Sequence, residues 1–224
     1  MAKVFLSAGH GGSDAGAVAN GLKEKDVNLH ALLACKEVLE KHGVDVVCSR
    51  VKDENDTVYD EVREANASGA SIVVSFHANA GKGDGFEAFY YTTSGKGKKL
   101  ALLGEKYIKL LGQNSRGIKS GNHLYFIRKT RQPAVLFESF FLDNATDKAI
   151  GDTVEEQKAF GVAYAKAILE FFNIPYVDNK KTIQQIAKEV IAGKWGNGNE
   201  RKTKLYAAGY NYKTIQAEVN RLLK

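Results

Sequence analysis

Apolar residues follow two alternating patterns along roughly the first 170 positions. Short runs that are apolar on both faces, such as 71–76 and 134–137, are typical of strands buried in a parallel sheet. Between about Lys25 and His42, apolar residues recur at the spacing of one helix face, and Gly43 ends that pattern. This alternation of strand and helix patterns predicts an α/β protein.

The same patterns give the order of the expected elements. Strands are expected at residues 4–8, 44–49, 71–76, 86–91, 124–127 and 134–137. Helices are expected at 25–42, 56–68, 98–111 and 153–172, and Thr153 with Glu156 forms a capping box at the start of the last one. We therefore expect a three-layer α/β domain around a mostly parallel twisted sheet.

A change of pattern near residue 175 separates this domain from the rest of the chain. A proline and several polar residues make 175–181 the expected linker. Thr182 and Gln185 then form a second capping box, and later glycines divide the remainder into about three short helices. The predicted organisation is a domain at 1–174, the linker, and a small three-helix module at 182–224.

The net charge of +6 is concentrated in the tail. Residues 181–224 carry nine Lys or Arg and three Glu, so the other 180 residues are formally neutral. A basic segment on a neutral body indicates attraction to a polyanion such as nucleic acid, an anionic membrane or an anionic cell-wall polymer. The alternative is an ordinary solvated surface.

Composition excludes some classes of protein. The hydrophobic fraction is 44%, yet no apolar stretch approaches the roughly 20 residues that cross a bilayer, so we expect no integral membrane contact. The chain starts directly with a strand-like segment, so export by a signal peptide is not expected.

Polar side chains stand at the ends of three apolar runs. His10 follows the run at 4–8, His77 follows 71–76, and Glu138 follows 134–137. Because ligands gather outside the carboxyl ends of the strands in open α/β sheets, these three side chains can converge. Glu24 lies shortly after His10, near the start of the first expected helix. The four residues form a candidate site.

The residue types indicate a metal. Catalytic zinc commonly has three protein ligands, drawn from histidines and carboxylates, and a water in the fourth position. His10, Glu24 and His77 would fill those three places. Each has a simpler interpretation, as a turn residue, a charge favoured by the helix dipole and a strand-end polar residue respectively. Their joint occurrence in glycine-rich or small-residue surroundings favours the metal.

Glu138 is expected to act as the acid–base group. It follows four apolar residues, so its carboxyl is partly desolvated and its pKa should rise toward the range useful for proton transfer. A zinc ion would polarise a carbonyl, while Glu138 removes a proton from water and later passes it to a leaving amine. The predicted reaction is hydrolysis of an amide.

Several segments, taken in order, resemble the zinc-dependent N-acetylmuramoyl-L-alanine amidases of the amidase-3 type. They are Gly9-His10-Gly11-Gly12-Ser13-Asp14-Ala15-Gly16-Ala17, then Glu24 with Asn28-Leu29, then Ser75-Phe76-His77-Ala78-Asn79-Ala80, then Pro133-Ala134-Val135-Leu136-Phe137-Glu138. The resemblance spans roughly residues 3–172. One departure is Phe140, which stands where relatives usually have glycine.

The resemblance implies a function. It implies zinc ligands at His10, Glu24 and His77, a catalytic glutamate at Glu138, and cleavage between the lactyl group of muramic acid and L-alanine in peptidoglycan. Asn79 and His123 are additional candidates for substrate contact, His123 because its loop could border the cleft.

The tail is similar to the cell-wall-binding repeats of the CW_7 type, over nearly all of 182–223. Relatives form three-helix bundles that bind the muropeptide. Candidate wall contacts are Arg201, Lys204, Tyr210 and Tyr212. Only one copy is present, so we expect either modest affinity or dependence on self-association through this module. The expected partner is peptidoglycan and not nucleic acid.

Together the two resemblances predict a peptidoglycan hydrolase. The expected context is a phage or prophage endolysin, made in the bacterial cytoplasm and acting on the wall after release. The alternatives are a sporulation-type lytic amidase, another zinc amide hydrolase, and a wall-binding protein whose site is inactive.

Overall fold

The computed structural model describes residues 2–178, 181–208 and 210–223. The chain divides into two compact units, one ending at Tyr176 and the other beginning at Val177. Within the predicted linker, residues 179 and 180 lie outside the described residues. In the part of the chain that the structure describes, no helix has the length and apolar character needed to span a bilayer.

The larger unit is built on a six-stranded sheet with the strand order β4-β1-β5-β8-β6-β7. Its strands are β1 (Lys3–Ala8), β4 (Asp45–Cys48), β5 (Ile72–Asn79), β6 (Phe86–Tyr90), β7 (Ser115–Ser120) and β8 (Ala134–Phe141). All neighbouring pairs are parallel except β6 and β8. The predicted mostly parallel sheet is confirmed. A separate hairpin joins β2 (Val18–Ala19) to β3 (Leu22–Lys23).

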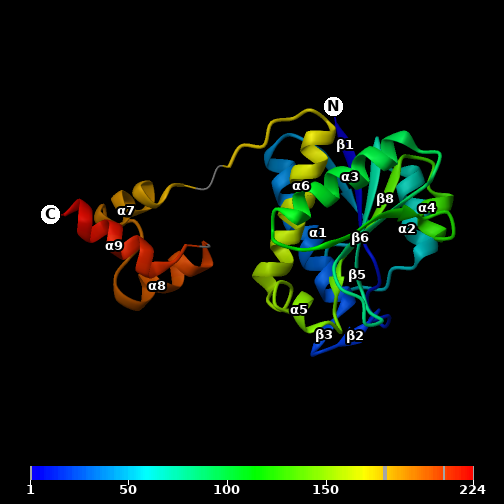
Figure 1. Cartoon of the computed structure of the whole chain (residues 1–224). Coiled ribbons are helices and arrows are strands. Elements are labelled where there is room, and N and C mark those ends of the chain that lie inside the picture. Colours follow the sequence, from blue (N-terminus) through cyan, green and yellow to red (C-terminus); the bar gives the residue numbers. More distant parts are fainter. Residues whose placement is uncertain (1, 179–180, 209, 224) are drawn as a thin grey trace. The chain divides into compact units, whose positions relative to one another are not determined.

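Helices cover both faces of this sheet (Figure 1). One layer contains α1 (Glu24–Lys41), α3 (Gly95–Lys109) and α6 (Val154–Phe171), and the other contains α2 (Val58–Ala67) and α4 (Tyr125–Lys129). Alternate residues of one strand serve the two layers: Val74 packs in the core under α1 and α6, and Val73 in the core under α2 and α4. The short helix α5 (Ala145–Lys148) follows β8.

The predicted strand at 124–127 is wrong, because Leu124 is the N-cap of α4 and residues 125–127 form its first turn. Phe126 and Ile127 are both buried in the cluster that also holds Leu136 of β8, and one helical turn places both against the sheet. An apolar run of four residues does not distinguish the two structures by itself. The edge strand β7 was not predicted, because its sequence Ser-Arg-Gly-Ile-Lys-Ser lacks an apolar run.

The smaller unit contains α7 (Ile183–Ile191), α8 (Gly198–Ala207) and α9 (Tyr212–Leu222). The predicted capping box is present. The Thr182 side chain accepts a hydrogen bond from the Gln185 N–H, and the Gln185 side-chain oxygen accepts one from the Thr182 N–H. Six buried residues form the core of this unit: Ile186, Ala187, Val190, Leu205, Ile215 and Val219. Trp195, Tyr210 and Tyr212 pack against that core.

The contact between α1 and α6 depends on Gly161. A Cβ atom at this position would lie 2.1 Å from the backbone oxygen of Ala31, so the two helices pack backbone to backbone here. Any larger side chain would force the helices apart.

We expect Gly161→Ala to lower the free energy of unfolding by about 1–3 kcal/mol, because overpacking displaces α6 from α1. Thermal or urea unfolding measures the change. Gly95→Ala is the matched control, since Gly95 lies in α3 with open space at its Cβ position, and it should cause no loss. Equal stability of the two variants would contradict the proposed contact.

Candidate metal centre

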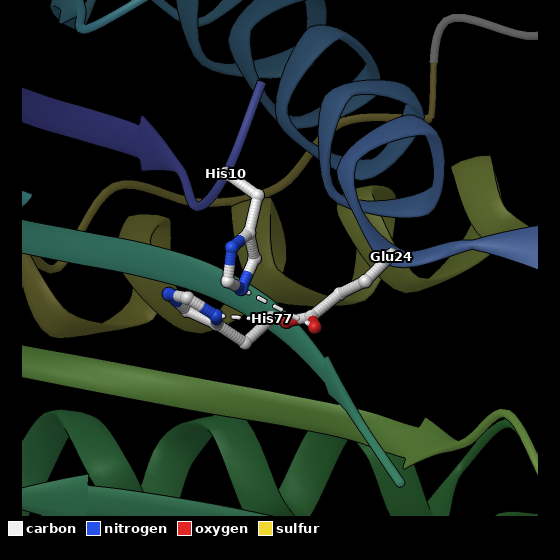
Figure 2. A group of neighbouring side chains, drawn as sticks. All are labelled: His10, Glu24 and His77. Atoms are coloured by element: carbon white, nitrogen blue, oxygen red, sulfur yellow. Dashed lines mark hydrogen bonds and ion pairs between the residues drawn. The ribbon is translucent and has the colours of Figure 1, made fainter. Parts of the chain in front are cut away.

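Three elements deliver the candidate ligands to one point. His10 follows β1, Glu24 is the first residue of α1, and His77 lies near the end of β5. The pairing of Ala8 with Phe76 aligns the ends of β1 and β5 at the same edge of the sheet. One ligand atom from each of the three side chains lies within 4.8 Å of the others, and Figure 2 shows them pointing toward one another.

The backbone before His10 is shaped for this approach. A Cβ atom on Gly9 would lie 2.1 Å from Cε1 of His77, so only glycine leaves room for the imidazole ring. The Gly9 N–H donates to the Phe76 carbonyl at 3.1 Å, which fixes the chain to β5. His10 itself has φ of 66°, a conformation that is uncommon for residues other than glycine and is often found at functional sites.

Arg50 holds the same loop in place through hydrogen bonds to backbone carbonyls. It follows β4 and is only 1% exposed. Its Nε donates to the Ala8 carbonyl at 2.9 Å and its Nη2 to the Lys25 carbonyl at 2.7 Å. The guanidinium therefore ties the end of β1 to the start of α1, the two segments that carry His10 and Glu24.

Hydrogen bonds orient both imidazole rings. Nδ1 of His10 donates to Oδ2 of Asp14 at 2.8 Å, which directs Nε2 of the ring toward Oε2 of Glu24, 3.3 Å away. Nδ1 of His77 lies 2.9 Å from Oε1 of Glu24 (Figure 2). Each carboxylate oxygen of Glu24 thus faces one histidine nitrogen.

The charges in this cluster support one another. Burial favours the protonated form of Glu24, but the hydrogen bonds from His10 and His77 outweigh burial and hold its pKa well below the usual range. The hydrogen bond to Glu24 raises the pKa of His10 to about 9 against the effect of burial. Burial would lower the pKa of His77, yet Glu24 keeps it raised. Both histidines therefore favour the protonated form beside an ionised Glu24 carboxylate.

This arrangement fits a divalent metal ion. Two histidines and one carboxylate form a known catalytic zinc set that leaves a coordination position open. Asp14 holds the second nitrogen of His10, which is the usual support for a metal-binding histidine. A cation at this point would take the place of protons between the two histidines and Glu24, because metal ligands must be deprotonated.

Glu138 lies beside the centre. It is the register partner of His77 in the pairing of β5 with β8. Its Oε2 is buried and has no hydrogen-bond partner among the described residues. Burial raises the pKa of Glu138 to about 7. A carboxyl group with that pKa can both take and release a proton near neutral pH.

Glu87 was not identified from the sequence. It is the register partner of Glu138 in the antiparallel pairing of β6 with β8, and it is 5% exposed. Its carboxylate accepts a hydrogen bond from Arg116 and another from Lys119 at 2.5 Å, both on β7. The sequence feature that could have identified Glu87 is a single charged residue inside an apolar strand, at Phe86-Glu87-Ala88.

A cavity of about 700 Å³ opens next to the metal centre. His10 and His77 form one end of it. Its other lining residues come from four segments: the loop after β1, residues 55–59 and Glu61 around the start of α2, residues 124–126 around the start of α4, and Leu136 of β8. The loop contributes Gly11, Ser13 and Asp14. The centre is therefore accessible from a cleft between two helices and the sheet.

The other residues of the larger unit that the sequence singled out lie outside the cluster of candidate ligands. Asn79 ends β5, where its side-chain oxygen accepts a hydrogen bond from the Ala80 N–H at 2.8 Å. His123 is exposed and packs edge-on against Phe89, and the cavity wall begins at the next residue, Leu124. Phe140 is fully buried and stacks on Phe160, so it belongs to the core.

The candidate wall contacts in the smaller unit differ in their contacts with other residues of that unit. Arg201 donates to the Gly196 carbonyl at 3.0 Å and to the Asn197 side chain at 2.9 Å, so it stabilises its own unit. Lys204 is exposed and forms an ion pair with Glu200. Tyr210 donates through its hydroxyl to the Lys181 carbonyl, and Tyr212 lies under the Lys202 ammonium.

Known proteins resemble both units. Residues 4–170 match the family described as N-acetylmuramoyl-L-alanine amidase, and residues 184–223 match the CW_7 repeat. The chain is 38% identical to the N-acetylmuramoyl-L-alanine amidase CwlM of Bacillus licheniformis, over 66% of this chain and 59% of CwlM. It is 37% identical to the endolysin of Bacillus phage SPP1, over 76% of this chain and 66% of that protein.

A solved structure extends the comparison to the fold. The catalytic domain of CwlV, an N-acetylmuramoyl-L-alanine amidase from Bacillus (Paenibacillus) polymyxa, superimposes with a TM-score of 0.72 at 31% identity, covering 78% of this chain and 100% of that domain. The chain spans about 59% of the length of CwlM and so does not match that relative throughout. With the family match covering most of the chain, the chain belongs to the N-acetylmuramoyl-L-alanine amidase family.

Proposed function

We propose that this chain is a zinc-dependent peptidoglycan hydrolase that cleaves the amide between the lactyl group of N-acetylmuramic acid and L-alanine. The observation that carries the proposal is the convergence of His10, Glu24 and His77, with Glu138 as the register partner of His77. Membership of the amidase family supports the same bond as the substrate.

The chain's own residues supply positioning and proton transfer. His10, Glu24 and His77 would hold the zinc ion, with Asp14 and Arg50 keeping the ligands in place. When bound, zinc supplies a Lewis acid that polarises a carbonyl and lowers the pKa of water. The carboxylate of Glu138 takes a proton from the attacking water and, as the C–N bond breaks, returns it to the leaving nitrogen of L-alanine.

The proposal assigns wall binding to the smaller unit. Its match to the CW_7 repeat and its excess of basic residues support binding to an anionic wall. Lys204 is the most exposed of the candidate contacts, whereas Arg201 and Tyr212 are engaged within their own unit. The 37% identity to a phage endolysin supports the proposal that this chain is a lysin, which reaches the wall after release from the host cytoplasm.

We expect Asp14→Asn to weaken zinc binding by about 10–100-fold, because the second nitrogen of His10 loses its carboxylate partner. A competition titration with a chromophoric chelator measures the affinity. Asp152→Asn is the control, since Asp152 is half exposed and pairs with Lys148. If both variants bind zinc like the unaltered protein, Asp14 does not support the ligand.

Replacing Glu138 with Gln should retain zinc and lower turnover by about 10²–10⁴-fold, since the amide cannot take a proton from water. The measurement is release of new L-alanine amino groups from purified peptidoglycan. Glu155→Gln, at an exposed position in the first turn of α6, should leave the rate unchanged. New reducing sugar ends in the digest, or full activity of the Glu138→Gln variant, would refute the proposal.

Truncation after Tyr176 tests the role of the smaller unit. The remaining unit has its own core and should keep its metal, while its binding to purified cell walls should weaken. Because ionic attraction is screened by salt, the difference from the full chain should shrink as ionic strength rises. Co-sedimentation with walls at several salt concentrations measures this, and equal binding by the two proteins would reject the assignment.

A further inference from the structure

The cavity beside the metal centre has an aromatic rim. Tyr59 of α2 is 66% exposed, although it is a large apolar side chain. It packs against Tyr125 of α4 with ring centroids 4.7 Å apart. Val58 next to it is 37% exposed. Exposed tyrosines at a cavity mouth provide rigid contact surface for a ligand that has both apolar and polar faces.

The walls below this rim are acidic. Among the residues of the described chain that line the cavity, the acidic ones are Asp14, Asp56 and Glu61, and none is Lys or Arg. Glu61 is only 3% exposed, and the mechanism gives it no task. Oδ2 of Asp56 is buried and has no hydrogen-bond partner in the described part of the chain. These carboxylates can accept hydrogen bonds from a ligand but cannot donate them when ionised.

Burial makes these carboxyl groups sensitive to the charge of the ligand. It raises the pKa of both Asp56 and Glu61, because the ionised form loses solvation. A neutral ligand rich in hydroxyl and amide N–H donors would restore that lost solvation. A ligand with free carboxylates would add repulsion between like charges.

The two parts of the proposed substrate differ in this respect. In the uncut substrate the muramic acid ring is neutral, since its lactyl carboxyl group is tied up in the amide, and it carries hydroxyl and acetamido donors. The stem peptide carries free carboxylates. The cavity therefore matches the chemistry of the sugar and opposes that of the peptide.

The opposite side of the centre is basic. β6 and β7 lie beyond β8, away from β1 and β5. Arg116 and Lys119 on β7 remain 44% and 37% exposed while they pair with Glu87. Their remaining donors suit carboxylates of a peptide. The centre thus lies between an acidic, aromatic cavity and a basic sheet edge.

We propose that the cavity between α2 and α4 is the subsite for the N-acetylmuramic acid ring, with Tyr59 as its stacking platform, so that the stem peptide extends toward Arg116 and Lys119. This inference rests on the proposed amidase function. It assigns a direction to the substrate across the metal centre.

The test uses the full chain, loaded with zinc, and two inhibitors of muropeptide cleavage. One is the methylamide of N-acetylmuramic acid, which has the neutral sugar and no peptide. The other is L-alanyl-D-isoglutamine, which has the peptide and no sugar. Tyr59→Ala should raise the inhibition constant of the sugar about 5–20-fold and leave that of the peptide unchanged.

Tyr91→Ala is the matched control, because Tyr91 is 37% exposed and lies outside the lining of this cavity. It should change neither constant. Zinc content and unfolding temperature of both variants should equal those of the unaltered protein, which separates a ligand contact from a structural role.

The outcomes distinguish the two proposals. If the unaltered protein cleaves no muropeptide, the proposed function fails, and the subsite fails with it. If it cleaves the muropeptide but Tyr59→Ala changes neither constant, changes both equally, or weakens only the peptide, the function stands and the sugar subsite is overturned. The sugar failing to inhibit the unaltered enzyme at millimolar concentration would also overturn it.

Discussion

The parallel alignment of β1, β5 and β8 is the constraint on which the rest of the site depends. Parallel neighbours end at the same edge of a sheet, so the residues that follow or close these strands meet there. The pairing of Ala8 with Phe76 and of His77 with Glu138 sets their relative heights. A shift of one residue in either pairing would turn a ligand toward the wrong face.

Burial at this edge gives the polar groups their chemical properties. Glu24 is 6% exposed and would favour the protonated form by itself, but two histidines keep it ionised. Glu138 has no such partner on Oε2, so burial raises its pKa to about 7. Two neighbouring carboxyl groups thus differ in protonation, and their proposed roles follow from this difference: Glu24 as a ligand and Glu138 as an acid–base group.

The residues that hold the candidate ligands in place have specific structural requirements of their own. Arg50 is buried with its donors on backbone carbonyls of both ligand-bearing segments, and removing it would take away charge-assisted hydrogen bonds worth about 1.5–3 kcal/mol each. Gly9 provides the space for His77 that any side chain would fill. The proposed metal site therefore depends on residues outside the three candidate ligands.

Hydrophobic periodicity by itself determined the layered α/β fold and the succession of most elements, because strands and helices bury their apolar residues at different spacings. Three residues at strand ends, with Glu24 at the start of a helix, also indicated the four-residue site. Only the tertiary structure decided that 125–127 is helical, since packing against Leu136 selects between two conformations that a four-residue apolar run allows. It alone revealed Glu87 beside Glu138 and the cavity lined by Tyr59 and Tyr125, because these contacts join segments that are distant in sequence.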